Sequence, residues 1–310
     1  MPVVELAGVT KAYESKVAVS NLSLSIEAGQ MFGLLGPNGA GKTSSIRMMM
    51  GITVPDSGRI SLFGKPFERG SLDRVGYLPE ERGLYKKMKV LDQLVFIGCL
   101  HGLGAEEARK RALSWAKRLE IADVLHKKAQ ELSKGMQQKI QFIATLVHEP
   151  GLIVMDEPFS GLDPLNATLL QNTLLDLKDQ GRAILFSTHR MDQVEKLCDS
   201  IALISRGKLV LTGSMRDVKS RYPRNRVQVV FSGDESFLGH AEVAEAQNYS
   251  GVAHLKLHHE AGAQVVLAEA IARGTVINRF EVKEPTLEEI FIEQVRASFG
   301  DEEARGIVDA

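Results

Sequence analysis

The chain has 310 residues, of which 44% are hydrophobic and 25% charged, and its formal net charge is −1. This length allows one large domain and a smaller one, while the near-neutral charge provides no general field that would favour a nucleic acid. The two cysteines, Cys99 and Cys198, have neither metal-ligand nor redox spacing, which favours reduced thiols. No apolar run approaches the roughly 18–20 residues that span a bilayer, and the N-terminus lacks a signal-peptide layout, so we expect a cytoplasmic protein that can still dock on a membrane protein.

The first part of the chain alternates strand patterns with helix patterns. Between about residues 91 and 147 the pattern is mostly helical, with apolar residues at spacings of three and four. The segment 200–213 predicts a hairpin that turns at Arg206–Gly207. Short apolar strands are predicted at 31–36, 58–64, 74–79, 151–158 and 182–189. Strands that alternate with helices predict an α/β fold with a largely parallel sheet.

Around residues 219–226 the pattern breaks into a basic segment with a proline, which indicates a solvated linker. The sequence after it predicts a small α+β domain that ends in a helix after Pro285, with Thr286 as its N-cap and Glu289 three residues on. We therefore expect a first domain over 1–220 with a helical subdomain at about 88–147, an accessory domain over 226–300, and a flexible polar tail over 301–310.

The segment "GPNGAGKT", residues 36–43, fits the phosphate-binding pattern G-x-x-x-x-G-K-[ST]. It follows a predicted strand and opens a predicted helix, which is the context that this motif requires. Glycines let backbone N–H groups converge on a polyphosphate, and the helix N-terminus adds positive potential. Lys42 is then expected to reach the β- and γ-phosphates, and the Thr43 hydroxyl to ligate Mg²⁺. A glycine-rich turn without a ligand is the alternative.

Two acids follow the apolar strand "LIVM". Asp156 falls at the carboxyl end of that strand, where open α/β sheets bind ligands, and is expected to hold Mg²⁺. Glu157 can accept the proton of a water that attacks the γ-phosphate, or orient that water. An acid pair at a helix N-terminus is the alternative. His189 follows another strand and is either structural or a donor to the γ-phosphate.

A second anion-binding turn is predicted in "LSKGMQQK", residues 132–139. Ser133 offers a hydroxyl group and Gly135 a backbone N–H, and the apolar spacing after them predicts a helix whose N-terminus faces the anion. A serine-capped helix that binds nothing is the alternative.

From about Val3 to Leu211, the ordered set of motifs resembles the ATP-binding subunit of ABC transporters. "GPNGAGKT" is similar to its Walker A motif, "LSKGM" to its signature, "LIVMDE" to its Walker B motif, "SGLD" to its D-loop and "STH" to its switch histidine. The resemblance implies a P-loop NTPase cassette, with a RecA-like sheet core and a helical subdomain, that uses ATP and Mg²⁺. It also implies that two subunits pair head to tail, so that each signature turn caps the γ-phosphate bound to the other subunit.

The matching motif positions imply roles for single residues. The resemblance implies catalysis by Glu157, His189 and Lys42, and Mg²⁺ binding by Thr43, Glu80 and Asp156. Tyr13 matches the aromatic residue that stacks on adenine, although a core tyrosine is the alternative. Two departures are a carboxylate, Glu80, where the family usually has the Q-loop glutamine, and Lys134 with Met136 in the signature. The residues implied to contact ATP are Tyr13, Gly36, Pro37, Asn38, Gly39, Ala40, Gly41, Lys42, Thr43, Ser44, Ser133, Gly135 and Asp163.

The stretches "YLPEERGLYKKMKVLDQL" and "EPTLEEIFIEQV" resemble the ATPases of ABC-2 type exporters, especially the sodium-efflux, NatA-like group. This implies separate integral membrane permease chains, a homodimer or heterodimer of ATPase subunits, and a place on the cytoplasmic face of the membrane. Sodium, drugs, peptides, lipids and polysaccharides remain open as cargo. The alternatives are a soluble mechanoenzyme acting on ribosomes or DNA, and an ATP sensor without turnover; no nucleic-acid partner is expected. His254, His258 and His259 are interpreted as surface residues, because no other metal ligand accompanies them.

Overall fold

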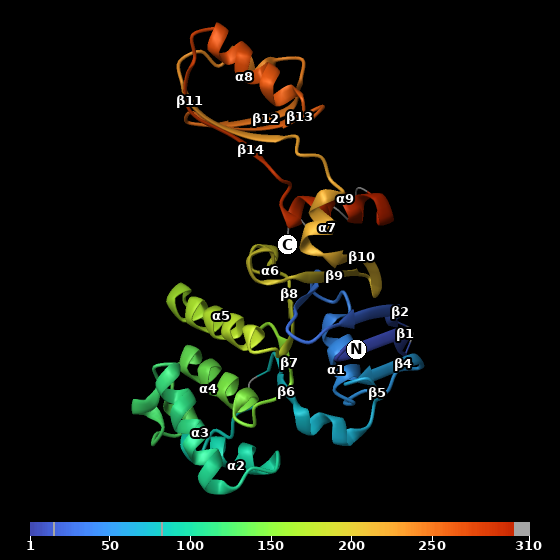
Figure 1. The fold of residues 1–310 in the computed structure, drawn as a ribbon, viewed down its shortest axis with the longest axis vertical. Coiled ribbons are helices and arrows are strands. Elements are labelled where there is room, and N and C mark those ends of the chain that lie inside the picture. Colours follow the sequence, from blue (N-terminus) through green and yellow to red (C-terminus); the bar gives the residue numbers. More distant parts are fainter. Residues whose placement is uncertain (15, 82, 301–310) are drawn as a thin grey trace. The chain divides into compact units, whose positions relative to one another are not determined.

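The computed structural model describes residues 1–14, 16–81 and 83–300, which form two compact units. The first unit runs from Met1 to Ser214, and the second begins at Met215 (Figure 1). Among the described residues, no helix is both long and apolar enough to cross a membrane.

A six-stranded sheet forms the centre of the first unit, with the strand order β10-β9-β3-β8-β7-β6. All neighbouring strands are parallel except β10, which pairs antiparallel with β9. Strands β3, β7 and β8 are buried along their whole length, which explains why they read as continuous apolar runs. Because the strands are parallel, their carboxyl ends meet at one edge of the sheet. The bounds are β3 Met31–Leu35, β6 Val75–Leu78, β7 Leu152–Asp156, β8 Ala183–Thr188, β9 Ser200–Ser205 and β10 Lys208–Ser214.

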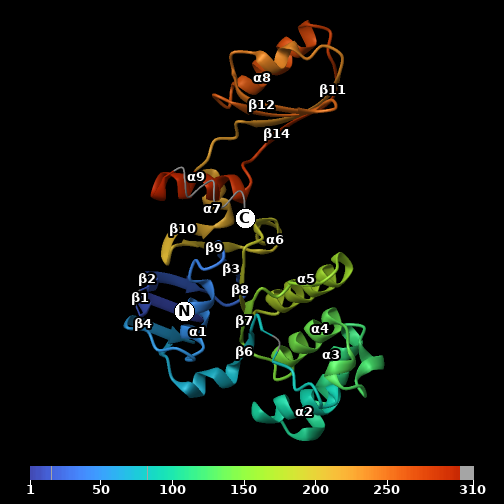
Figure 2. The ribbon, with the colours of Figure 1, turned by 180° about the vertical axis from the view of Figure 1, so that it is seen from behind.

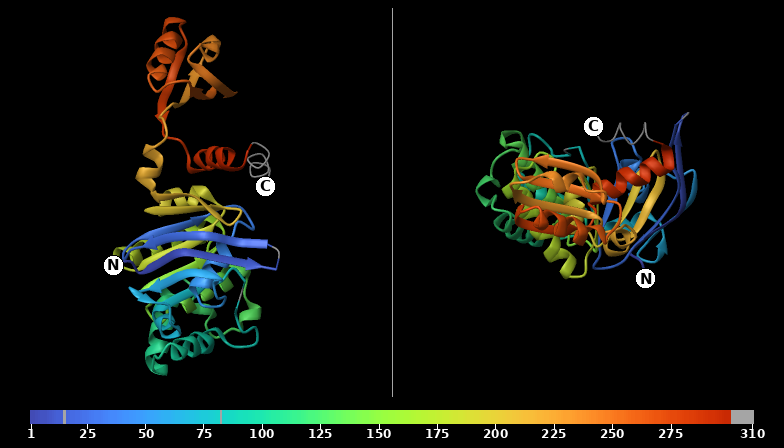
Figure 3. Two further views of the ribbon diagram at one scale, coloured as in Figure 1. Left: turned by 90° about the vertical axis from the view of Figure 1, so that its right-hand side faces the viewer. Right: turned by 90° about the horizontal axis from the view of Figure 1, so that it is seen from above.

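A second, antiparallel sheet of the first unit has the order β2-β1-β4-β5. Helix α1 (Lys42–Met49) packs between the two sheets, and one hydrophobic cluster joins α1 to both of them (Figures 1 and 2). The long strands β1 and β2 lie side by side, with β2 at the edge of this sheet (Figure 3). Their bounds are β1 Val4–Tyr13, β2 Lys16–Ile26, β4 Ser57–Leu62 and β5 Lys65–Pro66.

Helices cover the opposite face of the six-stranded sheet. The segment expected to be mostly helical contains α2 (Val90–Leu100), α3 (Ala105–Arg118) and α4 (Lys134–Leu146). Three alanines on α3, spaced four residues apart, are fully buried, so the backbone of this helix packs closely against its neighbours. Trp115, on the same helix, is only half-buried. The remaining helices of this unit are α5 Pro164–Asp179 and α6 Met191–Leu197, with the 3₁₀ turns η1 Arg69–Arg74, η2 Ala122–Val124 and η3 Ala129–Glu131.

The hairpin predicted at 200–213 is confirmed. Its turn uses Arg206 at φ 49° and Gly207 at φ 75°, the left-handed pair that matches the twist of antiparallel strands.

The second unit is an α+β fold, as predicted. Its antiparallel sheet has the order β12-β13-β11-β14, and α8 packs on one face over a core that includes Val229, Phe231 and Phe237. The capping box predicted at Thr286 and Glu289 is confirmed at the start of α9. The bounds are α7 Met215–Ser220, β11 Arg226–Ser232, η4 Ser236–Gly239, β12 Val243–Tyr249, β13 Val252–Leu257, α8 Gly262–Ala272, β14 Val276–Lys283 and α9 Leu287–Phe299.

Two features at the start of the second unit differ from expectation. The units divide after Ser214, earlier than the expected position 220, because α7 groups with the second unit. The expected solvated linker is partly fixed: the backbone N–H of Arg224 donates to Glu260 at 2.7 Å, its guanidinium contacts Glu284 at 2.5 Å, and Asn225 is buried. The predicted tail at 301–310 lies outside the described residues.

Two smaller expectations agree with the structure. His254, His258 and His259 are exposed, as expected for surface residues. Cys99 and Cys198 are both free thiols, and burial raises the pKa of Cys198 well above its usual value.

Candidate nucleotide site

The phosphate-binding loop joins β3 to α1, and its shape requires glycine. Gly36, Gly39 and Gly41 have φ values of 151°, 76° and 111°, where other residues are strained. A Cβ atom on Gly36 would lie 2.1 Å from the carbonyl oxygen of Ile204, and one on Gly41 would lie 2.4 Å from that of Ala18. The loop is therefore held tightly between β9 and the start of β2.

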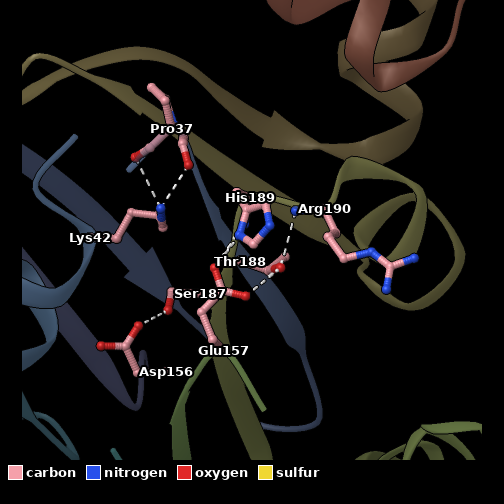
Figure 4. Close-up of polar contacts among 9 residues, drawn as sticks. Pro37, Lys42, Asp156, Glu157, Ser187, Thr188, His189 and Arg190 are labelled. Atoms are coloured by element: carbon pink, nitrogen blue, oxygen red, sulfur yellow. Dashed lines mark hydrogen bonds and ion pairs between the residues drawn. The ribbon is translucent and has the colours of Figure 1, made fainter. Parts of the chain in front are cut away.

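Lys42 is buried at the first position of α1. Its ammonium group donates to the carbonyl oxygens of Gly36 at 2.7 Å and Pro37 at 3.1 Å (Figure 4). Burial lowers its pKa, and the nearby carboxylates of Glu157, Asp156 and Glu80 oppose this shift. A lysine amine thus lies within a loop built for phosphate and close to three acids.

Asp156 ends β7 and is 1% exposed. The Ser187 hydroxyl, on the adjacent strand β8, donates a short hydrogen bond to its Oδ1 atom (Figure 4). Its other oxygen, Oδ2, is buried and has no hydrogen-bond partner among the described residues. A buried carboxylate oxygen without a donor requires a positive partner, and hard oxygen ligands are those that Mg²⁺ prefers.

A cavity of about 440 Å³ connects these groups. Thr43, Glu80 and Asp156 bring a hydroxyl and two carboxylates to its wall, and this oxygen set fits a magnesium ion. Tyr13, 43% exposed, lies at the same cavity, so it is not the core residue of the alternative interpretation. The lining residues are Tyr13, Lys16, Ala18, Asn38, Gly39, Gly41, Lys42, Thr43, Ser44, Glu80, Asp156 and Glu157.

Glu157 follows β7 in a left-handed conformation, with φ 50°. Its carboxylate accepts three hydrogen bonds from the end of β8: the Thr188 hydroxyl at 3.0 Å, the backbone N–H of His189 at 3.0 Å, and His189 Nδ1 at 2.8 Å (Figure 4). The register that pairs Asp156 with Ser187 places both acids beside "STH". His189 therefore orients Glu157 through Nδ1, and the His189 side chain is 54% exposed.

The signature turn does not line this cavity. Ser133 caps α4 by accepting from the backbone N–H of Met136 at 3.3 Å. Ser133, Lys134 and Met136 are exposed, and Gly135 is half-buried. Asp163 likewise lies outside the cavity, as the N-cap of α5, where hydrogen bonds from Asn166 lower its pKa. Within one chain, the two predicted phosphate contacts belong to separate surfaces.

Two sets of residues were missed from the sequence. Lys16 and Ala18, at the start of β2, line the cavity. The sequence signal that could have indicated them is the basic residue Lys16, three positions after Tyr13. Ser187 and Thr188 hold the two acids, and the signal is their two hydroxyl groups directly before His189. Gly36, Pro37, Ala40 and His189 belong to the predicted motifs but do not line the cavity.

Similarity to known proteins shows the family to which this chain belongs. The family model described as "ABC transporter" matches residues 19–160, and that described as "ATP-binding protein DrrA1-3-like, C-terminal domain" matches 213–295. The chain is 43% identical over 292 residues to "Uncharacterized ABC transporter ATP-binding protein YhaQ" of Bacillus subtilis, covering 94% of this chain and 98% of that protein. The chain belongs to the ABC transporter ATP-binding proteins.

Further similarities support the same family. This ABC protein is 34% identical over 296 residues to "Linearmycin resistance ATP-binding protein LnrL" of Bacillus subtilis, covering 92% of this chain and 95% of that one. A solved structure described as "Structure of ATP binding subunit of ABC transporter" matches with a TM-score of 0.67 and 28% identity, covering 71% of this chain and 92% of that chain. This ABC protein therefore has the P-loop NTPase fold of the cassettes and is an ATPase coupled to transport.

Proposed function

We propose that this chain is the ATP-hydrolysing subunit of an ABC-2 type exporter. In this proposal it acts as a pair of ATPase subunits on the cytoplasmic face of the membrane, bound to separate permease chains. The observation that carries the proposal is the separation of Ser133 and Gly135 from the cavity that contains Lys42, Asp156 and Glu157. A nucleotide in that cavity is enclosed only when a second chain brings its own signature turn.

The residues of the cavity fit ATP hydrolysis. Lys42 and the N–H groups of the loop bind the β- and γ-phosphates. Thr43, Asp156 and Glu80 are the residues that would hold Mg²⁺, which neutralises phosphate charge when bound. Glu157, fixed by Thr188 and His189, orients the attacking water and accepts its proton.

Pairing and reopening follow from the same contacts. The Ser133 hydroxyl and the α4 N-terminus of one subunit bind the γ-phosphate held by the other subunit, so ATP joins the two chains. Loss of the γ-phosphate after hydrolysis removes this contact, and the pair opens. The permease chains couple this cycle of closing and opening to transport.

Two similarities support export over other uses of ATP. One full-length relative is named for resistance to linearmycin, and the second unit matches the DrrA1-3-like C-terminal domain. A drug-like compound therefore leads among the candidate cargoes, with Na⁺ as the other candidate from the NatA-like resemblance.

The test uses the Glu157→Gln variant, which blocks hydrolysis, with ATP and Mg²⁺. We expect light scattering to show an ATP-dependent rise from monomer to dimer, alone or with the permease, and no rise with ADP. In parallel, the ATPase activity of the wild-type protein should increase on reconstitution with the permease and stay constant with ribosomes or DNA. ATP binding without self-association in either setting would exclude the proposed mechanism.

A further inference from the structure

Helix α4 carries three buried polar side chains on one face. Gln138, Gln141 and Thr145 are 6%, 5% and 4% exposed, and their spacings of three and four residues align them along the helix. This face lies inside the first unit, where a polar group requires a hydrogen-bond partner. The partners of these side chains are therefore informative.

Gln138 and Gln141 donate to backbone carbonyls beside acids of the candidate site, whereas Thr145 donates within its own helix. Gln138 Nε2 donates to Pro158 O at 3.0 Å, directly after Glu157. Gln141 Nε2 donates to Glu81 O at 3.4 Å, directly after Glu80. Thr145 Oγ1 donates to Gln141 O at 2.9 Å and approaches Tyr77 O, in β6, at 3.4 Å. Helix α4 thus holds the backbone at the residue that directly follows each of two acids of the cavity, Glu157 and Glu80.

Stability does not explain Gln141. Its Oε1 atom is buried and has no hydrogen-bond partner among the described residues. A buried amide with an unpaired oxygen stabilises a fold less than an apolar side chain of similar shape. A role in placing the Glu81 carbonyl accounts for an amide at this position.

We propose that Gln138 and Gln141 are positioning residues, through which α4 sets the places of Glu157 and Glu80 respectively. Ser133 is the N-cap of this helix, so contact between the signature turn and the neighbouring subunit's nucleotide would shift the same helix that holds this chain's own acids. The effect of the neighbour's nucleotide on this chain's own acids, which would couple the two nucleotide sites, rests on the proposed function. The positioning of the two acids rests on the hydrogen bonds within one chain.

The experiment compares Gln138→Met with Gln141→Met, since methionine keeps the length of glutamine and removes its donors. In Gln141→Met, we expect the Mg²⁺ concentration for half-maximal ATPase activity to rise about tenfold, at little change in kcat under saturating Mg²⁺. In Gln138→Met, we expect kcat to fall about tenfold, at an unchanged Mg²⁺ requirement. The Tm of Gln141→Met should equal or exceed that of the wild type.

Thr173→Val is the matched control. Thr173 is 2% exposed, and its hydroxyl donates to Leu169 O at 2.8 Å within its own helix, α5. This variant loses a buried hydrogen bond that holds neither acid, so its kcat and Mg²⁺ requirement should match the wild type.

The outcomes separate this proposal from the proposed function. If wild-type subunits fail to associate with each other in the presence of ATP, the proposed function fails. The positioning of the acids is still tested in that case, because Gln138→Met should change kcat and Gln141→Met the Mg²⁺ requirement. If wild-type subunits associate but both variants keep wild-type kinetics, the positioning proposal alone is overturned. Equal losses of Tm and kcat in both variants, without the split, would also overturn it.

Discussion

Three donors fix the carboxylate of Glu157, and this arrangement decides what the residue can do. The hydrogen bonds come from Thr188 and from two groups of His189, all at the end of β8. An acid held in this way keeps one orientation toward the cavity, where Lys42 and Asp156 also lie. At the residue scale, the candidate chemistry depends on side chains that the adjacent strand supplies.

Replacing Glu157 with Gln tests its role as the base. The amide keeps the size of the side chain but cannot accept the proton of the attacking water. We expect kcat to fall by roughly 10²-fold or more while ATP affinity stays within a few-fold of the wild type. Steady-state ATPase assays and equilibrium nucleotide binding measure the two quantities.

Glu106→Gln serves as the control for that change, because Glu106 is an exposed acid in the first turn of α3. It should turn over ATP at the wild-type rate. Wild-type turnover in the Glu157→Gln variant itself would remove Glu157 from the catalytic step.

At the element scale, the phosphate loop fits its surroundings closely at Gly41. We expect Gly41→Ala to lower the free energy of unfolding by about 2–4 kcal/mol, because the new Cβ atom would lie 2.4 Å from Ala18 O as well as at positive φ. Gly39→Ala meets no atom within 4 Å and carries only the backbone strain, so we expect about 1 kcal/mol. Denaturant unfolding of both variants without nucleotide compares them, and equal losses would contradict the tight fit.

A histidine pair connects α2 to the end of α4. The rings of His101 and His148 stack with centroids 3.7 Å apart, and both Nδ1 atoms are buried without a partner among the described residues. Burial lowers the pKa of His148 to about 4, with further lowering from the charges of His101 and Arg111, while the hydrogen bond with Val75 O and the charge of Asp73 oppose this shift. Burial also lowers the pKa of His101. The folded protein thus keeps His148 neutral where the unfolded chain binds a proton.

This difference predicts a pH dependence of stability. The unfolded state binds the proton near pH 6.5 and the folded state only near pH 4, so stability is full above pH 6.5 and falls as pH decreases toward 4. We expect a loss of about 1 kcal/mol at pH 5 from His148, after allowance for solvent screening of the partly exposed ring. Thermal unfolding at pH 7 and pH 5 measures it. His148→Gln should reduce the slope, whereas His258→Gln, at an exposed position, should leave it unchanged.

The elements around the site could be predicted because each motif follows a local pattern. The apolar strands ending at Leu35, Asp156 and Thr188 are parallel, so the loops after them necessarily meet at one edge of the sheet. Local sequence could not show that Ser187 pairs with Asp156, because strand register is decided by contacts between distant segments.

Two features of the second unit were not predicted from the sequence. Strand β12 was not expected, because it is an edge strand with most of its residues exposed and has no clear apolar alternation. The fixed backbone at Arg224 depends on Glu260 and Glu284, which are distant in sequence. Local composition therefore indicated a free linker where one long-range backbone hydrogen bond and one ion pair hold the chain.

At the scale of the whole molecule, the division of the phosphate contacts between two surfaces predicts that defective chains complement each other. In the proposed head-to-tail pair, Lys42→Ala would remove the lysine that binds phosphate in a chain's own cavity, and Ser133→Ala would remove the contact that the chain offers to its neighbour. In a head-to-tail pair of one variant with the other, one site combines both defects. The other site combines the intact Lys42 of one chain with the intact Ser133 of the other.

Mixing the two variants should therefore restore activity that neither has alone. With random pairing, half of the dimers are mixed and each has one complete site, so we expect about one quarter of wild-type ATPase activity if the sites act independently. Measurements on equal mixtures, beside each variant alone at the same total concentration, test this. Two damaged subunits can form one intact site only if each nucleotide is enclosed by two chains. A mixture that is no more active than its components would therefore mean that each chain completes its own site.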